Sequence, residues 1–502
     1  MDFQQIVGKI KKTWKDIENI DKILMAILVV FLFVRLLTLF YLPYRGWDET
    51  VYLNLGFDLS KNPFFYSLLN SGWNDYIPSS DTIYGWPNIG FRAPLLPYLL
   101  SLLYFLKLDF FIPAVIPLIA TLSIFLVYKL GGMLFNKRVG LYSATLFSLI
   151  PIHIYASGKI WTDVFVVFFI LLTFVSFWKG YENENNRHKV LFGLFLALSL
   201  MSRYTTLWIA PIFLLYFIFR DKSLKFINDK YLWRAVLTFF LILLPWFIYS
   251  IIFYSNPFGA FIHGFKAAGY WGGAQSGFYF FINSWRIFSI IGLFFIVSLL
   301  MILIKKEYLK KEVYLLLIWI VFFSIMVISM PHKEDRFIMP IIPAVCLISG
   351  FYIDKLKKFK YLILGILLIF LILSLFNQFK IEKQNAKDLT VSCFVDGNKY
   401  LASSQINKNS LIITNQDPIV HYYTKKDIMI YPNPLELDSL NKAINSKYSK
   451  RDIYLFFANY DMVMDSKIKK DLDDNFKKVY ECSKGYGYSA IYKYDYFNIK
   501  LD

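Results

Sequence analysis

Long apolar segments recur along the first three quarters of the chain, and they constrain its fold more than any other feature. Most have about 17 to 22 residues, enough for a helix to cross a hydrocarbon core of roughly 30 Å. We identify eleven, at approximately 23–43, 110–130, 139–157, 162–178, 189–202, 203–219, 233–254, 286–304, 313–330, 338–356 and 360–376. Since 57% of the residues are hydrophobic, a water-soluble protein is excluded. The sequence predicts a polytopic α-helical membrane protein with about eleven transmembrane helices.

The placement of the basic residues predicts how these helices are oriented. Lys and Arg number 54 against 36 Asp and Glu, and the cytoplasmic loops of membrane proteins collect Lys and Arg. With a cytoplasmic N-terminus, the inner loops hold Lys9, Lys11, Lys12, Lys15, Lys22, Lys129, Lys137, Arg138, Lys179, Arg187, Lys189, Arg220, Lys222, Lys225, Lys230, Arg234, Lys305, Lys306, Lys310, Lys311, Lys355, Lys357, Lys358 and Lys360. We therefore expect a multi-pass cell-membrane protein with an extracytoplasmic C-terminal segment. The same bias explains the basic balance, so no nucleic-acid partner is expected.

One apolar stretch, 94–106, is too short to span the membrane. Counting it as a span would invert every later loop and place Lys137 and Arg138 outside. We therefore predict a helix that lies at the membrane interface, within a long outer loop at 44–109.

The composition changes at about residue 377 to Lys, Asn, Asp and Ser with short apolar runs. These runs predict strands at 411–414, 428–431, 453–458 and 486–494, and helices near 417–424, 434–447 and 464–477. Alternating strands and helices are typical of a small α/β domain. The expected organisation is a transmembrane catalytic domain at 1–376 and an extracytoplasmic α/β domain at 377–502.

The three cysteines exclude a disulfide-rich scaffold, and their spacing does not indicate zinc. Cys346 lies in an apolar segment, whereas Cys393 and Cys482 lie in the C-terminal part. A disulfide between the last two is possible outside the cytoplasm. Two free thiols fit the sequence equally well.

Charged residues within or beside apolar segments are costly and often functional. Arg35 lies inside the first segment, at a cost of about 2.5 to 3.5 kcal/mol if it has no partner. It either pairs with a carboxylate on a neighbouring helix or contacts a ligand.

Asp48 and Glu49 follow directly after the first apolar segment. A carboxylate anchored at the membrane rim can act as a general base, whereas the plain alternative is a helix N-terminus that favours acidic residues.

Further charged residues gather in the other predicted outer loops. They are Arg92, Lys159, Asp163, Arg203, His263, Lys266, Arg286, His332, Lys333, Glu334, Asp335 and Arg336. A solvated loop carries charge at little cost, so each alone indicates little. Lys and Arg are normally scarce in outer loops, because they collect on the cytoplasmic side. Here they occur in the same outer loops as the carboxylates, which favours a site that binds an anionic group of a membrane-embedded molecule.

These motifs resemble those of the GT-C superfamily of membrane glycosyltransferases, which use polyprenyl-phosphate-linked sugars. Asp48-Glu49-Thr50 resembles the acidic motif of protein O-mannosyltransferases and the lipid A aminoarabinose transferase. The segment 92–97 is similar to their basic-then-proline segment, and 159–163 is similar to their second acidic element. The segment 332–337 resembles the HKE-type motif of mannosyltransferases that build lipid-linked glycans.

The resemblance implies a GT-C-like fold and an inverting hexosyltransferase that is similar to mannosyltransferases. The donor would be a polyprenyl (dolichyl) phosphate sugar, and the acceptor a hydroxyl on a protein, a glycolipid or a glycan on the extracytoplasmic side. Asp48 would be the base, with Glu49 beside it, and Asp163 and Glu334 would be supporting acids. The donor phosphate would meet Arg45, Arg92, Lys159, Arg203, His332, Lys333 and Arg336.

Some features depart from these families. The aminoarabinose transferase motif continues with an Arg where this chain has Val51, so Arg45 or Arg92 would replace that phosphate contact. A Trp-Trp-Asp motif is absent from the sequence, which argues against an oligosaccharyltransferase. No metal cofactor is required, because the basic side chains suffice to neutralise one phosphate. If a metal ion were bound, Asp48 and Asp163 would be the residues that hold it.

The alternative function is a polytopic transporter or lipid flippase. Such proteins show internal repeats, broken helices in matching positions and ionisable residues at the membrane midplane. In this chain the ionisable residues gather at one rim and no convincing repeat is found. This pattern favours chemistry at one face of the membrane.

The predicted orientation can be tested by cysteine labelling in intact cells. A cysteine introduced near residue 440 should react with an impermeant thiol reagent, because the C-terminal segment is expected outside. One introduced near residue 184 should be protected until the cells are opened, and the parent protein gives the background. The reverse pattern would refute the orientation.

Overall fold

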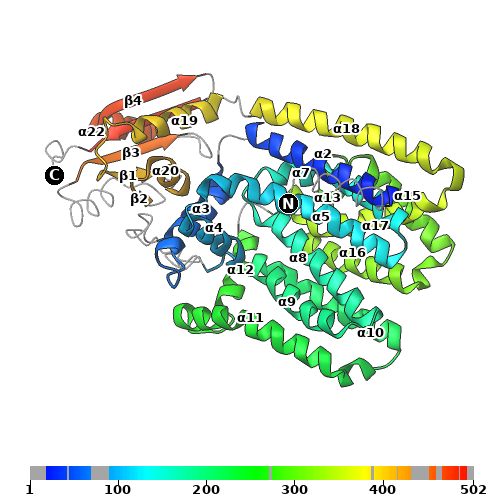
Figure 1. The fold of residues 1–502 in the computed structure, drawn as a ribbon. Helices are drawn as coiled ribbons and strands as arrows, with labels where there is room; N and C mark the ends of the chain where they lie inside the picture. Colours follow the sequence, from blue (N-terminus) through cyan, green and yellow to red (C-terminus); the bar gives the residue numbers. More distant parts are fainter. Residues whose placement is uncertain are drawn as a thin grey trace, which may run out of the picture. The chain divides into compact units, whose positions relative to one another are not determined.

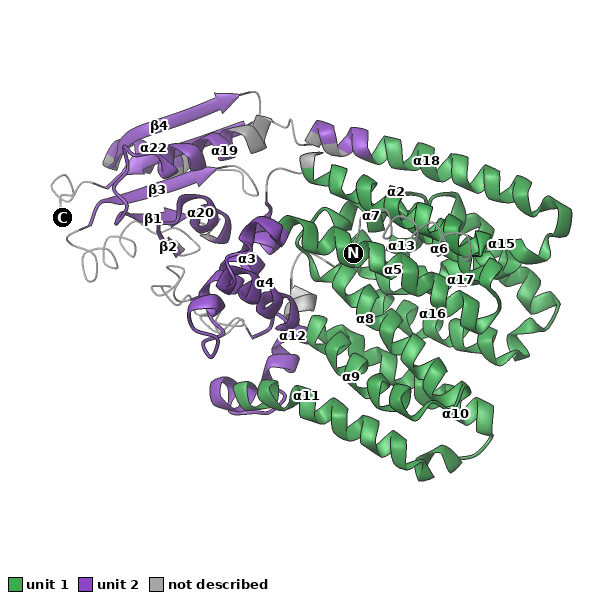
Figure 2. Cartoon of the chain, viewed as in Figure 1, with its two compact units in different colours: residues 1–40, 113–249, 268–378 green, residues 41–112, 250–267, 379–502 purple. Residues whose placement is uncertain are grey.

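The structure of the chain is a computed structural model that describes residues 18–41, 45–68, 90–270, 274–385, 389–414, 417–430, 451–458, 466–484 and 487–494. Two compact units are formed (Figure 2). Unit 1 comprises Met1–Phe40, Pro113–Tyr249 and Ala268–Gln378, and unit 2 comprises Tyr41–Ile112, Ser250–Ala267 and Phe379–Asp502. The predicted helix at 434–447 and residue 440 lie outside the described residues.

Unit 1 is built from helices (Figure 1). They are α2 (Asn19–Tyr41), α5 (Ile112–Leu134), α6 (Lys137–Ser148), α7 (Pro151–Ser157), α8 (Thr162–Phe177), α9 (Asn186–Ser202), α10 (Ala210–Asp221), α11 (Lys230–Tyr254), α15 (Ile290–Ile304), α16 (Lys311–Ser329), α17 (Ile342–Lys355) and α18 (Lys360–Asn385). Short helices α13 (Tyr279–Ile282) and α14 (Ser284–Phe288) precede α15. Short 3₁₀ or π-helical segments lie between other helices: η4 (Trp178–Glu182), η5 (Tyr204–Ile209), η6 (Lys225–Asn228), η7 (Glu307–Leu309), η8 (Asp335–Ile341) and η9 (Lys357–Phe359).

Among the described residues, seven helices are long and apolar enough to cross a membrane, or eight if the bent pair α6 and α7 is one span. A helix or helix pair is present at each of the eleven predicted segments, and the multi-pass membrane class is confirmed. The number of crossings stays a prediction.

The segment 139–157 differs from the single straight span that was expected. It forms α6 and α7, which meet at an angle of 65°. Pro151 begins α7 and cannot donate the backbone hydrogen bond that would continue α6. Arg35 on α2 lies at this break, where it donates to the Ser148 carbonyl and lies 3.0 Å from His153 Nδ1. Among the described residues its partners are therefore carbonyls and a histidine, not the carboxylate considered from the sequence.

Unit 2 contains the helix that carries the acidic motif, several further helices and the C-terminal sheet. Its helices are α3 (Trp47–Lys61), α4 (Leu95–Phe105), most of α12 (Gly259–Tyr270), α19 (Leu389–Ala402), α20 (Asp417–Thr424) and α22 (Ser466–Asn475), with the turn η3 (Asp109–Phe111). The expected helix at 94–106 is thus present as α4, and its place at the membrane interface stays a prediction. The division of the chain into domains at residue 376 also stays a prediction.

The C-terminal sheet has the strand order β2-β1-β3-β5-β4. The strands are β1 (Leu411–Thr414), β2 (Asp427–Ile430), β3 (Ile453–Ala458), β4 (Lys477–Lys484) and β5 (Gly487–Lys493). Strand β1 is parallel to β2 and β3, whereas β5 is antiparallel to β3 and β4. Alternate residues of β1 enter two separate cores: Ile412 packs with residues of α19 and α20, and Leu411 and Ile413 pack with Leu472 of α22. The predicted α/β class is therefore confirmed.

Two elements of this sheet region were missed from the sequence. Strand β4 is rich in Lys and largely exposed, so it lacks the apolar run that marks a buried strand. Helix α19 contains Thr390, Val391, Val395 and Gly397, which are poor helix formers. Cys393 of α19 and Cys482 of β4 form a disulfide with Cα atoms 5.5 Å apart, which settles the alternative left open above.

Close packing of α9 and α11 in unit 1 depends on a glycine, which gives a test of the fold. A Cβ atom at Gly193 would lie 2.0 Å from the Ala235 carbonyl oxygen, whereas one at Gly365 in α18 meets nothing within 4 Å. Overpacking costs roughly 1–3 kcal/mol. Gly193→Ala should therefore lower the thermal unfolding midpoint in detergent by a few degrees, and Gly365→Ala should not. Equal midpoints in the two variants would contradict the packing of α9 against α11.

Candidate functional site

The acidic motif forms the first turn of α3. Gly46 precedes the helix in an extended conformation, and its N–H donates to Glu49 Oε2 at 3.1 Å. Glu49 also pairs with Arg45 at 2.8 Å and is 1% exposed. A carboxylate in this position satisfies a free backbone donor and suits the helix dipole. Glu49 is thus placed to fix the start of α3, as in the plain alternative considered from the sequence.

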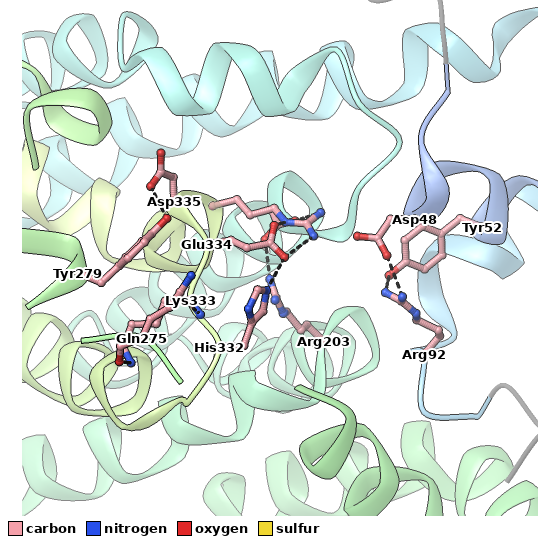
Figure 3. A network of polar contacts seen from close by, with 12 residues as sticks. Asp48, Tyr52, Arg92, Arg203, Gln275, Tyr279, His332, Lys333, Glu334 and Asp335 are labelled. Carbon is pink, nitrogen blue, oxygen red and sulfur yellow. Dashed lines mark hydrogen bonds and ion pairs between the residues drawn. The ribbon is translucent and has the colours of Figure 1, made fainter. Parts of the chain in front are cut away.

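Asp48 has a different environment from its neighbour. Arg92 Nη2 donates to Asp48 Oδ1 at 2.7 Å, and the two side chains are 18% and 20% exposed (Figure 3). Arg92 also donates to the Tyr52 hydroxyl at 3.4 Å, and its guanidinium carbon lies 5.4 Å from the centre of the Trp47 ring. Of the two adjacent acids, Glu49 is buried and Asp48 is partly exposed. Asp48 is therefore the one that a dissolved molecule can reach.

The approach of Asp48 and Arg92 follows from how α3 and α4 pack. A Cβ atom at Gly56 would lie 2.7 Å from Leu100 Cβ of α4, so a glycine is needed for the two helices to come this close. Arg92 lies just before α4, and the Tyr66 hydroxyl donates to its carbonyl at 3.1 Å. We call Arg45, Asp48, Glu49 and Arg92 the α3 cluster; all four belong to unit 2.

A second set of predicted site residues meets in unit 1. Asp163 is in the first turn of α8, is 4% exposed, and accepts from Arg203 Nη1 at 2.5 Å. Arg336 Nη1 lies 3.9 Å from the other Asp163 oxygen, and Arg336 Nε lies 2.7 Å from Glu334 Oε2. His332 Nε2 is 3.2 Å from Glu334 Oε1. We call these five residues the loop cluster; Figure 3 shows His332, Glu334 and Arg203 turned toward one another.

Lys159 and Lys333 have distinct positions in unit 1. Lys159 Nζ lies 6.0 Å from the Trp161 ring centre, and the Arg336 guanidinium carbon lies 4.1 Å from the same centre. Lys333 is 3% exposed, and its Nζ donates to the carbonyls of Gln275 and Met330 at 3.2 and 2.5 Å. The ammonium of Lys333 therefore holds the loop backbone, and its role as a phosphate ligand stays a prediction.

Two residues that hold this loop were missed from the sequence. Gln275 Oε1 accepts from the Lys333 backbone N–H at 2.6 Å, and the Tyr279 hydroxyl donates to Asp335 Oδ1 at 3.0 Å (Figure 3). Arg286 pairs with the same Asp335. Burial and the Asp335 carboxylate raise the pKa of Tyr279 above its usual value. A lone Gln or Tyr in a polar loop has no sequence signal that distinguishes it from a solvated residue.

The acidic residues of both clusters are held by cations rather than grouped with one another. Among the described residues, no group of three or more His, Cys, Asp or Glu side chains is placed to hold a metal ion. Each cluster combines carboxylate with guanidinium groups, an arrangement that can take up a proton and bind an anionic oxygen.

Comparisons with known proteins define the class of this fold. In structure, the chain is similar to ArnT from Cupriavidus metallidurans bound to undecaprenyl phosphate, with a TM-score of 0.67 and 12% sequence identity over 94% of this chain and 99% of that one. It is also similar to the oligosaccharyltransferase AglB from Archaeoglobus fulgidus in complex with an inhibitory peptide and a dolichol-phosphate, with a TM-score of 0.52 and 14% identity over 95% of this chain and 75% of that one.

The sequence comparisons point to the same class. Residues 92–249 match the family model described as dolichyl-phosphate-mannose-protein mannosyltransferase. No curated protein matches the chain in sequence. The chain thus has the fold of the GT-C membrane glycosyltransferases, and the resemblance indicated by its motifs is confirmed. The oligosaccharyltransferase likeness is one of fold, and the missing Trp-Trp-Asp motif remains a difference.

Proposed function

We propose that the chain is a membrane glycosyltransferase that moves a sugar from a polyprenyl phosphate to an acceptor hydroxyl on the extracytoplasmic side. The main support is the partly exposed carboxylate of Asp48, which is hydrogen-bonded to Arg92 at the start of a helix in a GT-C fold. The solved structure of ArnT is bound to undecaprenyl phosphate, and that of AglB is in complex with a dolichol-phosphate. The matched family model makes a mannosyl donor the first to test.

In the proposed reaction, Asp48 accepts the proton of the acceptor hydroxyl. The hydroxyl oxygen forms a bond to the anomeric carbon, and the bond from that carbon to the phosphate oxygen breaks on the opposite face. Configuration is therefore inverted, and the electron pair leaves on polyprenyl phosphate. A positioned base contributes about 10² to 10⁴ to the rate of such a step.

The leaving phosphate gains a negative charge during this step, which nearby cations stabilise. We assign this role first to Arg92, because its guanidinium is partly exposed and hydrogen-bonds to the proposed base Asp48. For Lys159, Arg203, His332 and Arg336 of unit 1 we keep the proposal from the sequence that they bind phosphate, and Arg45 pairs with Glu49. With this number of cations, we propose that turnover does not need a divalent metal, so a chelator should leave it unchanged.

The direct test is to incubate the purified protein with a panel of polyprenyl-phosphate sugars and acceptors, and to measure free polyprenyl phosphate and glycosylated acceptor. Formation of both in equal amounts supports the proposal. A transporter or flippase would move the lipid in vesicles without releasing polyprenyl phosphate, and that outcome would overturn it.

The base assignment is tested by Asp48→Asn. This change keeps the size and hydrogen bonding of the side chain, but an amide cannot take the acceptor proton. Turnover should fall at least about a hundredfold, while donor affinity changes little. Asp109→Asn is the matched control, because Asp109 is an exposed residue of unit 2 outside the α3 cluster. If Asp48→Asn retained more than about a tenth of wild-type turnover, Asp163 or Glu334 would become the leading base.

The phosphate assignment is tested by Arg92→Ala and Arg92→Lys. Charge-assisted hydrogen bonds contribute about 1.5–3 kcal/mol each, so Arg92→Ala should weaken donor binding by roughly one to two orders of magnitude. Arg92→Lys keeps the charge but loses the planar fork, and should lie between wild type and Arg92→Ala. Binding, not turnover, is measured, because losing Arg92 also changes the surroundings of Asp48. Equal donor affinity in all three proteins would refute the assignment.

A further inference from the structure

The C-terminal α/β region contacts the helix that carries the acidic motif. Helix α20 packs against α3 within unit 2. Asn54 Nδ2, in the middle of α3, donates to the Pro418 carbonyl in the first turn of α20 at 2.9 Å. Because Asn54 is 3% exposed, this hydrogen bond is shielded from water and holds the two helices in a defined register.

A second contact lies at the beginning of α3. The backbone N–H of Arg45 donates to the Tyr423 hydroxyl at 2.8 Å, between residues 378 positions apart in the sequence. Arg45 directly precedes Gly46, the N-cap residue of α3, and the Arg45 side chain pairs with Glu49. Burial raises the pKa of Tyr423 to about 12, so the hydroxyl remains neutral and able to accept this hydrogen bond at ordinary pH.

A third contact involves Trp47, the first residue of α3. Its ring packs against the core formed by α19, α20 and one face of the sheet. The same ring lies 5.4 Å from the guanidinium carbon of Arg92, which in turn pairs with Asp48. The C-terminal region therefore contacts Arg45 and Trp47 directly, and the Trp47 ring lies beside Arg92, the ionic partner of Asp48.

We propose that the C-terminal region sets the position of the acidic motif, and that Tyr423 is the positioning residue through which it does so. The inference rests on the proposed function for the role of Asp48. Tyr423 does not touch the reacting atoms; it fixes the backbone just before the helix turn from which Asp48 projects. A displacement of about 1 Å in a reacting group can lower a rate about a hundredfold, so a single hydrogen bond at this point matters for turnover.

The test is Tyr423→Phe in the full-length protein, with Tyr422→Phe as the matched control. Tyr422 is the neighbouring residue of α20, and its hydroxyl makes no hydrogen bond with other described residues. With the sugar donor that wild type uses, kcat of Tyr423→Phe should fall about 10- to 100-fold, whereas KM for the donor should change less than about twofold. Tyr422→Phe should keep wild-type values.

A merely structural role for Tyr423 would give a different result. In that case the unfolding midpoint and the yield of folded protein would fall, but kcat per folded molecule would equal that of Tyr422→Phe. This outcome would overturn the inference while leaving the proposed function intact.

Hydrogen exchange provides a readout that is independent of turnover. In Tyr423→Phe, the peptide covering residues 45–52 should exchange faster than in wild type, and strands β1 and β3 should be unchanged. Faster exchange in this variant alone supports the anchoring contact even if no sugar donor is found and the proposed function fails. Equal exchange in Tyr423→Phe and Tyr422→Phe would overturn the inference.

Discussion

The structure depends on how charge is neutralised in a largely apolar protein. Removing one partner of a buried ion pair costs roughly 3–5 kcal/mol, because the remaining charge has neither water nor a counter-ion. Glu49 and Asp163 are 1% and 4% exposed, and both are paired with arginine. These pairs thus constrain where α3 begins and how α8, Arg203 and the 331–337 loop are arranged in unit 1.

The two adjacent acids of the motif show how one local pattern can serve two roles. Neighbouring helix residues point about 100° apart, so only one can face Arg45 and the helix start. Glu49 does so and is buried, whereas Asp48 points to Arg92 and retains exposure. In the proposed mechanism, the buried acid keeps the helix start rigid, and the exposed acid takes up the proton.

The C-terminal sheet has a structural link to this motif. Helices α19 and α20 cover one face of the sheet, and α22 covers the other. A disulfide joins α19 to β4, which adds a covalent constraint to the body that Tyr423 and Pro418 belong to. A rigid body of this kind is suited to holding the start of α3, because a flexible partner would not restrict its motion.

Much of the fold follows from local sequence patterns. Apolar segments of spanning length predicted a helix at each of the eleven positions, and short apolar runs predicted β1, β2, β3 and β5. The motifs likewise identified Asp48, Arg92, Asp163 and Arg336 as candidates. These features could be predicted because the hydropathy and spacing of residues close together in the sequence largely determine where helices and strands form.

The partners of those residues depended on tertiary structure. Arg35 meets His153, Asp48 meets Arg92, and Arg45 meets Tyr423, across 118, 44 and 378 residues. The sequence alone offered several possible partners for each of these residues, and helix packing, including the close approach at Gly56, selected the ones observed. The sequence determined which residues beside apolar segments carry charge, and only the folded chain decided which of them are buried in ion pairs, as Glu49 is, and which stay partly exposed, as Asp48 does.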